Sequence, residues 1–530
     1  MANQHHLDIL SEGRESWNQW RELEPDETPD LSVADLRDIR RRFDYYDFSY
    51  ANLKGARMGG RSFRKTNFTG AVLRNANFEE AKLIEAIFVE ADLTYTRFNE
   101  AIIDKADFQG AILNNTRFQK ASLGSANLSG TDLRNTKFNE TNLRRGILTN
   151  CNLSGLKLSE IELSYAQLEG SNLSKSRIYE SKLWHANLKN CQLSETRISD
   201  VDLRQADLDN AIIMNSKFIS CNLRNTKLTN LACQAIEIKN SDLTSSNFEN
   251  SIFKKSIFSH NNLKRTKFLN TDFADSKILG CHFEKSRIKG LNLKKVEVSE
   301  SHFIHCKFDE TDFSYATMGS DVFAFTNFTT CIGLDQVEVT SECSIDIHSI
   351  MSVAPISMTF LKNLGLPTFF LNYLTDNPPP SFHSVFISHS SEDKEFVWKL
   401  HKHLKMHGVE VWIDDESLSP GDELRKIIFE KINSHDKTIL VCSKASLNSS
   451  WVTDEINKTL DKDEREKKGK GIKNTSLIPI SIDDYIHNFE GPFSSIIKSR
   501  KIGDFRDWRD DNSFKDQFQN LINGLQTSLD

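Results

Sequence analysis

Large apolar residues recur at every fifth position along most of the chain. From Phe43 to Phe328 this step gives 58 positions, of which 57 hold Phe, Leu, Ile, Val or Met and one holds Cys233. The residue two positions before each of these centres is usually small, as at Ala71, Ala76 and Ala81. A period of five fits neither a helix nor a strand. It predicts a chain that turns a corner every five residues, with one large and one small side chain pointing inward on each side.

Stacked turns of this kind bury a continuous core, as solenoids do. The triplets Ala-Asn-Phe (76–78) and Ala-Asp-Leu (91–93) resemble the units of the pentapeptide-repeat family. This resemblance implies a mainly β fold, a right-handed quadrilateral β-helix over residues 43–332. If four units form one coil, the chain would make about 14 coils and a rod about 70 Å long, at roughly 4.8 Å per coil.

Residues 1–42 are interpreted as an N-terminal helical cap with the first irregular repeats. Residues 5–23 predict one amphipathic helix that carries on one face Leu7, Leu10, Trp17 and Trp20. We expect the two tryptophans to contact the end of the core, because a solenoid needs its ends covered. Two repeat-like units follow at Leu31 and Leu36, and Phe43 comes seven residues later, which indicates a two-residue insertion.

The five-residue period ends near Gly333, and residues 333–380 are interpreted as a C-terminal cap and a Pro-rich linker. Short helical patterns cover 356–364 and 368–374. Three prolines at 378–380 forbid a helix or a central strand. They therefore mark the boundary of a last domain, residues 381–530.

Strand-like and helix-like segments alternate in this last domain. Strands are predicted at 383–388, 409–413, 438–442 and 477–482, and helices at 393–407, 422–432 and 447–460. This alternation is typical of an α/β domain with a parallel sheet covered on both faces. Binding sites on such sheets gather at the carboxyl ends of the strands.

Several segments of this domain, in the right order, resemble the TIR family, which implies a flavodoxin-like parallel α/β fold. They are FISHSSED (386–393), GVEVWIDD (408–415), LSPGD (418–422) and SLNSSWVTDE (446–455), with a weaker match at 503–508. Many TIR domains cleave NAD+ at the nicotinamide–ribose bond. The resemblance therefore implies NAD+ as a substrate, no separate cofactor and no metal.

The resemblance also implies that Glu455 is the catalytic residue. Bond cleavage builds an oxocarbenium-like ribose, which a nearby carboxylate stabilises. Trp451 lies one helical turn earlier on the same face and would wall the pocket. Further candidates for substrate binding are Ser388, His389, Ser390, Ser391, Trp412, Asp414 and Gly421. Structural alternatives stay open: a surface charge for Glu455, core packing for Trp451, helix capping for Ser391 and Asp393, and a solvated charge run for 461–470.

Composition and charge narrow the function classes. No stretch approaches the roughly 20 apolar residues of a membrane span, and the polar N-terminus does not look like a secretory signal, so we expect a cytoplasmic protein without membrane contact. Six cysteines occupy the small inward position and are expected to serve as packing rather than as disulfides. Net charge is −6 for residues 1–40, +3 for 41–380 and −4 for 381–530. The nearly neutral middle argues against nucleic-acid binding and against mimicry of DNA.

The leading hypothesis is a TIR NAD+ glycohydrolase gated by oligomerisation. TIR domains would self-associate through the loop at Pro420 and Gly421, and the rod would be a sensing or assembly module for an unknown protein or ligand, in bacterial defence or signalling. The alternative is a non-enzymatic TIR adaptor that only assembles protein complexes, because fold alone does not imply function.

Overall fold

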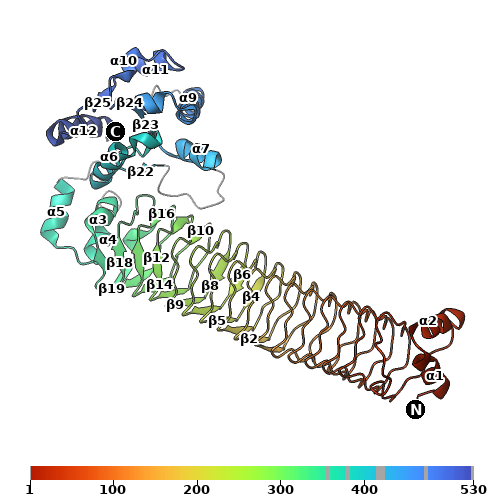
Figure 1. Ribbon diagram of the computed structural model, residues 1–530. Helices are drawn as coiled ribbons and strands as arrows, with labels where there is room; N and C mark the ends of the chain where they lie inside the picture. The colour runs from red at the N-terminus through yellow and green to blue at the C-terminus, as the bar shows by residue number, and fades with distance from the viewer. Residues whose placement is uncertain (1, 354–356, 377–381, 414–423, 471–475, 527–530) are drawn as a thin grey trace. The chain divides into compact units, whose positions relative to one another are not determined.

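The computed structural model describes residues 2–353, 357–376, 382–413, 424–470 and 476–526. The chain divides into two compact units, Met1–Asp376 and Asn377–Asp530. The first unit is a parallel β-helix whose coils stack in regular succession between helices at either end (Figure 1). No helix in the described part of the chain is long and apolar enough to cross a membrane.

Each coil of the β-helix contains four five-residue units, as the sequence predicts. Parallel bridges join residues 20 apart, such as Asn67 with Ile87 and Ile87 with Asp107. Within a unit the centre and the small residue are buried, and the residue between them points outward. The chain turns at the position two after each centre, where the backbone is left-handed, with φ of 57° at Glu90. The Glu90 N–H donates to the Gln109 carbonyl of the next coil (3.0 Å), which offsets part of the cost of this conformation.

Strands of two to four residues mark the later coils, and they form one long sheet and three short ones. The long sheet follows the order β1-β2-β3-β5-β7-β9-β11-β14-β17-β19, and the others are β4-β6-β8, β10-β13-β16 and β12-β15-β18-β20. The strands of the long sheet are β1 Lys157–Ser159, β2 Arg177–Tyr179, β3 Arg197–Ser199, β5 Lys217–Ile219, β7 Glu237–Lys239, β9 Ile257–Ser259, β11 Lys277–Leu279, β14 Glu297–Ser299, β17 Thr317–Gly319 and β19 Glu338–Ser341. Those of the short sheets are β4 Ile212–Met214, β6 Ala232–Gln234, β8 Ile252–Lys254, β10 Lys267–Leu269, β13 Arg287–Lys289, β16 Lys307–Asp309, β12 His282–Glu284, β15 His302–Ile304, β18 Val322–Ala324 and β20 Ser344–Ile345.

Stacked phenylalanine rings fill the core of the first coils. The rings of Phe68 and Phe88 lie parallel with centroids 5.0 Å apart, and Phe108 continues this stack at 4.9 Å. A second stack faces the first, and Phe98 meets Phe88 edge-on at 5.6 Å and 80°. Parallel stacking along the rod and edge-to-face contact across it are both favourable ring geometries.

The one centre without a large side chain has a local explanation. Cys233 follows Leu231, which occupies the small position of the same unit, and both side chains are buried. The large and small residues of this unit are thus exchanged, which keeps the core volume nearly constant. The other predicted inward cysteines are also buried, and every cysteine is a free thiol, as expected.

Two helices cap the N-terminal end, and this corrects the single helix predicted over 5–23. Helix α1 (Gln4–Glu12) and helix α2 (Arg14–Leu23) are separated by Gly13 at φ 128°. That backbone region favours glycine, so the chain turns there. As predicted, Trp17 contacts the end of the core: its ring lies 5.3 Å from Phe48, and its Nε1 donates to the Asp47 carbonyl (2.7 Å). Bridges between the first two coils join residues 22 apart, such as Asp30 and Asn52, which confirms the two-residue insertion.

The C-terminal end of the first unit continues the sheets before helices cover it. After the 3₁₀ turn η1 (Leu334–Gln336), β19 and β20 extend two sheets of the β-helix, with a β-bulge beside Gly319. Helices α3 (Ile347–Val353), α4 (Met358–Asn363) and α5 (Thr368–Asp376) follow. The ring of Phe360 on α4 lies 6.0 Å from Phe328, the last repeat centre, and closes the core.

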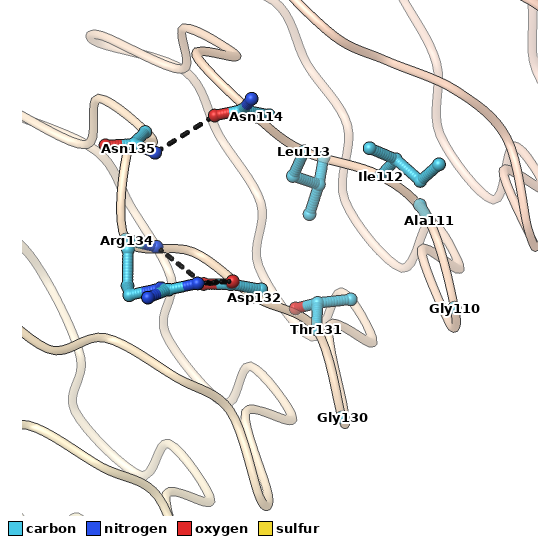
Figure 2. A pocket seen from close by; sticks show the side chains of 10 residues that line it. All are labelled: Gly110, Ala111, Ile112, Leu113, Asn114, Gly130, Thr131, Asp132, Arg134 and Asn135. Atoms are coloured by element: carbon cyan, nitrogen blue, oxygen red, sulfur yellow. Dashed lines mark hydrogen bonds and ion pairs between the residues drawn. The ribbon is translucent and has the colours of Figure 1, made fainter.

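The ladder of bridges is interrupted beside a crevice on the rod. Among the described residues, Ile112 and Asp132 are not bridged, although both pair with their other neighbouring coil. A crevice of about 420 Å³ lies there, lined by residues 110–114, 130–132, 134 and 135 (Figure 2). The Thr131 hydroxyl donates to the Leu128 carbonyl within its own coil. The Thr136 hydroxyl, in the next unit, donates instead to the Leu113 carbonyl of the preceding coil. The coils are therefore locally separated on this face.

The second unit is an α/β domain with a five-stranded parallel sheet in the order β22-β21-β23-β24-β25. This is the predicted flavodoxin-like arrangement, with β25 as a fifth strand that the sequence did not reveal. The strands are β21 Val385–Ser388, β22 Val411–Trp412, β23 Lys437–Cys442, β24 Leu477–Ser481 and β25 Gly503–Asp504. The helical elements are η2 Ser391–Asp393, α6 Lys394–Met406, α7 Leu424–Ser434, α8 Lys444–Leu447, α9 Ser450–Lys470, α10 Tyr485–Asn488, α11 Ser494–Lys498 and α12 Asp511–Leu525.

The charge run at 461–470 is not fully solvated, which corrects that prediction. Lys462 and Asp463 on α9 are buried. The Lys462 ammonium donates to the carbonyls of Ile432 and His435, and Asp463 accepts from the Ser476 N–H (2.9 Å). Buried charges are tolerated when such bonds satisfy them, so this turn of α9 anchors the helix to its neighbours.

Candidate functional site

The alternation of β21 directs Ser388 toward helix α9. Val385 and Ile387 pack in the core cluster that contains side chains of α6 and α12. Phe386 packs instead with residues of α7 and the partly buried Trp451 of α9. Because side chains alternate along a strand, Ser388 faces the same side as Phe386. It is the last residue of the strand and is 1% exposed.

Glu455 meets Ser388 at this carboxyl end of the sheet. The Ser388 hydroxyl donates to Oε2 of Glu455 over 2.5 Å. Glu455 is only 3% exposed, so the structure excludes the alternative of a solvated surface charge. Two residues 67 positions apart are thus joined where α/β sheets usually bind ligands.

Aromatic side chains line the same side of the sheet. Trp412 stacks on Phe386 with centroids 5.3 Å apart, and Trp451 packs half-buried against their cluster. The Arg425 guanidinium lies 5.6 Å from the Trp451 ring and pairs with Asp454 (3.2 Å). Trp451 therefore combines a core contact with partial exposure one helical turn before Glu455.

The loop after β21 holds the other predicted serines and the histidine. His389 is buried, and its Nδ1 lies 3.4 Å from the Ile387 carbonyl. The Ser390 hydroxyl caps η2 by accepting from the Glu392 N–H, so the cap is Ser390 rather than Ser391. Ser391 is exposed. Asp414 and Gly421 lie outside the described residues.

Asp393 fixes this loop to the loop after β23. Its Oδ2 accepts from the hydroxyls of Ser443 (2.7 Å) and Ser446 (2.6 Å), and Ser446 Oγ accepts from the Ser390 N–H (2.8 Å). Asp393 stands at the N-cap position of α6, as the sequence suggested, but its carboxylate bonds to these two serines and makes no capping hydrogen bond to the helix. The sequence also did not single out Ser443, although its position just after the third strand was a usable signal.

A cysteine thiol also lies at the carboxyl end of the sheet, on β23. Burial raises the pKa of the Cys442 thiol to about 12, so this cysteine at the end of β23 is not a thiolate nucleophile. Within the described ranges no cluster of three or more His, Cys, Asp or Glu side chains could hold a metal ion. Glu455 and Asp393 are both buried near the carboxyl end of β21, and Glu455 is the one that accepts a hydrogen bond from Ser388.

The coiled repeats and the parallel sheet define a protein of two modules, a repeat solenoid and a TIR-class α/β domain. The family model for the TIR domain matches residues 385–522. Models for pentapeptide repeats match residues 61–145, 157–194, 191–230 and 241–278. The chain is a pentapeptide-repeat protein with a C-terminal TIR domain.

Two curated relatives share part of their sequence with this chain. The NAD(+) hydrolase PdTIR of Paracoccus denitrificans is 43% identical over 84 residues, which are 16% of this chain and 27% of the relative. The 2′ cyclic ADP-D-ribose synthase BtTIR of Bacteroides thetaiotaomicron is 36% identical over 80 residues, 15% of this chain and 28% of the relative. The chain thus spans less than a third of the length of either relative.

Solved pentapeptide-repeat structures also match the chain. HetL, a pentapeptide repeat protein involved in heterocyst differentiation regulation from the cyanobacterium Nostoc, is 23% identical. The match covers 42% of this chain and 88% of HetL with a TM-score of 0.16.

Proposed function

We propose that the TIR domain cleaves the nicotinamide–ribose bond of NAD+ and that Glu455 is the catalytic residue. The observation that carries this proposal is the buried Glu455 carboxylate, held by the Ser388 hydroxyl at the carboxyl end of β21. The relatives named as an NAD(+) hydrolase and a 2′ cyclic ADP-D-ribose synthase support the same substrate.

The chemistry needs few groups. As the C1′–N bond of NAD+ breaks, both bonding electrons leave with nicotinamide, whose ring nitrogen loses its positive charge. Nicotinamide is then neutral and needs no proton from an acid. The ribose becomes an oxocarbenium-like cation, which the Glu455 carboxylate stabilises. Water adds to C1′ and releases a proton, which gives ADP-ribose. Trp451 would wall the pocket, and Ser388 would hold the carboxylate in place.

Cleavage of NAD+ harms the cell, so we propose that assembly of TIR domains gates the activity. The loop at Pro420 and Gly421 would contact a neighbouring TIR domain, and Asp414 remains a candidate for substrate binding. The rod would serve as the sensing or assembly module, in bacterial defence or signalling.

The first test measures nicotinamide release from NAD+ by chromatography with the purified full-length chain. The protein is assayed dilute, with a crowding agent and clustered on beads, beside the variants Glu455→Gln and Glu464→Gln. Glu464 is an exposed carboxylate on the same helix and serves as the matched control. We expect clustering to raise turnover, Glu455→Gln to lower it at least 100-fold, and Glu464→Gln to leave it unchanged.

Two results would count against this proposal. If Glu455→Gln cleaved NAD+ as fast as the parent chain, Glu455 would not be catalytic. If the folded parent chain self-associated but released no nicotinamide in any condition, the adaptor reading would replace the enzymatic one. The same chromatogram separates ADP-ribose from a cyclic isomer and so identifies the product.

A further inference from the structure

A row of seven cations runs along one face of the β-helix, in register from coil to coil. Each occupies the outward position between the small residue and the centre of its unit, and every one is exposed. Parallel bridges connect neighbours on this row, except between Lys137 and Lys157 among the described residues. The row consists of Arg97, Arg117, Lys137, Lys157, Arg177, Arg197 and Lys217.

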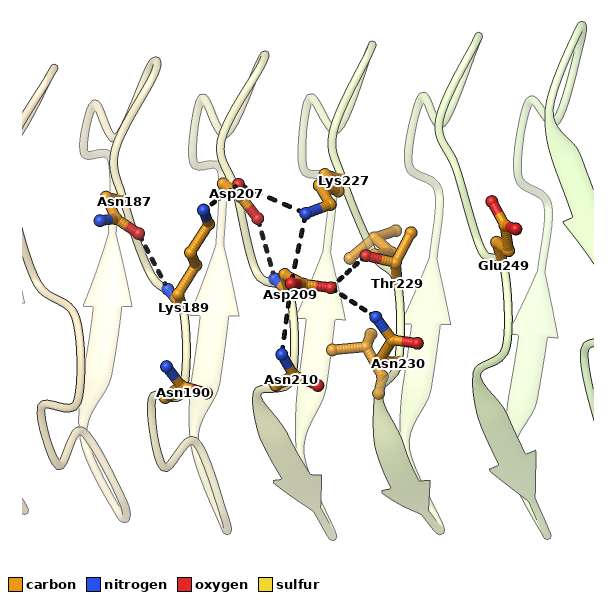
Figure 3. Close-up of polar contacts among 12 residues, drawn as sticks. Asn187, Lys189, Asn190, Asp207, Asp209, Asn210, Lys227, Thr229, Asn230 and Glu249 are labelled. Atoms are coloured by element: carbon orange, nitrogen blue, oxygen red, sulfur yellow. Dashed lines mark hydrogen bonds and ion pairs between the residues drawn. The ribbon is translucent and has the colours of Figure 1, made fainter.

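Carboxylates do not neutralise this row directly. Of its members only Lys217 forms an ion pair within the described residues, with Glu237 (2.6 Å), where the row ends. The opposite face, two units further along each coil, is arranged differently. There Lys189 and Lys227 both pair with Asp207, and Lys227 also pairs with Asp209 (Figure 3). The first face therefore keeps its positive charge, whereas the second cancels it between coils.

The spacing of the row fits a linear polyanion. Seven cations at roughly 4.8 Å per coil form a line about 29 Å long. Four of them are arginines, whose planar guanidinium groups bind phosphate through two hydrogen bonds. The next outward position of the same face carries neutral polar groups such as Gln119, Asn139 and Ser199. Such side chains bind phosphate and sugar oxygens, whereas a protein interface needs an apolar centre.

An acidic row limits the width of this surface. At the corner that follows the cations the exposed residues are mostly acidic: Glu80, Glu100, Glu140, Glu160, Glu180 and Asp200, with Lys120 between them. A second strand of phosphates would lie against these carboxylates and be repelled. The positive surface is thus a narrow line suited to one phosphodiester strand.

We infer that this row, residues 97–217 at every twentieth position, binds single-stranded nucleic acid along its sugar–phosphate backbone. The inference is independent of the proposed NAD+ cleavage. The nearly neutral total charge of residues 41–380 hides the row, because the cations and the neighbouring carboxylates occupy separate rows along the rod. Because each coil contains 20 residues, residues 20 positions apart lie in one row, and this spacing places like charges in the same row.

The test measures binding of labelled 20-nucleotide single-stranded RNA and DNA of one sequence, and of the matching DNA duplex, by fluorescence anisotropy. The full-length chain is compared with Arg117→Glu/Lys137→Glu/Arg177→Glu. The control is Lys54→Glu/Lys82→Glu/Lys294→Glu, which reverses three exposed cations on other faces and has the same net charge. Circular dichroism confirms that both variants fold.

We expect the parent chain to bind single strands more tightly than the duplex at 50 mM salt. The row variant should bind at least 30-fold more weakly, and the control should bind within about threefold of the parent. The slope of log affinity against log salt should fall by about 2 in the row variant, at about 0.7 per phosphate contact. RNA binding and DNA binding both support the inference, and their ratio identifies the natural strand. Equal weakening in the two variants, preference for the duplex, or no binding by the parent chain would overturn it.

Discussion

The rod and the TIR domain differ in the sequence separation of the residues that contact one another. In the rod every coil contacts the coil 20 residues away, as Ile87 does with Asn67 and Asp107. In the TIR domain the candidate site joins Ser388 to Glu455 and Asp393 to Ser443, over 67 and 50 residues. A position in the rod is therefore defined by its place in a five-residue unit, whereas a position in the TIR domain is defined by the whole sheet.

This difference has an energetic consequence. A solenoid is approximately a sum of coils and their nearest-neighbour interfaces. A destabilising substitution in one coil is therefore expected to affect mainly that coil and its neighbours. Adjacent residues can differ greatly in how much they contribute to stability, because one points inward and the next points outward. In the TIR domain one buried side chain bonds to several elements. Removing that side chain is therefore expected to affect loops that are distant in sequence.

The largest effect is expected from truncating a stacked ring. Phe88→Ala leaves a cavity between Phe68 and Phe108 and should lower the free energy of unfolding of the rod by about 3–5 kcal/mol. The matched control is Ile87→Ala, one residue earlier and 38% exposed, which should cost about 1 kcal/mol or less. Denaturant unfolding measures both, and equal losses would contradict the inward and outward assignment. Hydrogen exchange should rise in the neighbouring coils and stay unchanged in the TIR domain.

A second prediction concerns a buried acid inside the rod. Burial raises the pKa of Asp321 to about 6 from its usual 3.8, although it accepts from the N–H groups of Ser301 and Gly319. The folded chain therefore holds this proton more tightly than the unfolded chain. The free energy of unfolding should be lower above pH 6 than below pH 4, by about 3 kcal/mol from this group.

Asn261 occupies the equivalent inward position three coils earlier and shows how an amide fits there. Its Oδ1 accepts from the Ser241 N–H (2.9 Å) and its Nδ2 donates to the Ile238 carbonyl (2.7 Å). Asp321→Asn should therefore remove this contribution to the pH dependence, and Asn261→Asp should introduce one of the same sign. Thermal unfolding from pH 4 to pH 8 checks both. A parent-like pH profile in Asp321→Asn would refute the assignment.

The TIR domain should respond differently, because Asp393 is shared by two loops. Asp393→Ala removes the acceptor for Ser443 and Ser446 and should destabilise the TIR domain by about 1–3 kcal/mol. Hydrogen exchange should rise together in residues 385–393 and 443–447. Glu392→Gln, an exposed neighbour, is the control and should change neither segment. Faster exchange confined to the first segment would mean that the two loops are not coupled.

The repeat pattern predicted the rod almost completely, because each unit's burial depends only on its own five residues. It did not predict the turn at Gly13 or the opening between Ile112 and Asp132, which depend on contacts between coils. In the TIR domain the parallel sheet followed from alternating strands and helices. The pairing of Ser388 with Glu455 could not be derived from the pattern, because it depends on how α9 packs on β21.

The last prediction tests whether the two inward residues of one rod unit share a fixed volume, and its net effect is smallest in the double variant. Cys233→Leu adds bulk beside Leu231 and should cost about 1–3 kcal/mol through overpacking. Adding Leu231→Ala restores the usual small-then-large order, so the double variant should regain most of the parent's stability. Denaturant unfolding of the parent, both single variants and the double variant gives the coupling energy. A coupling near zero would mean that neighbouring coils, rather than the unit itself, set the space available, and the rod would then resemble the TIR domain in how it specifies its core.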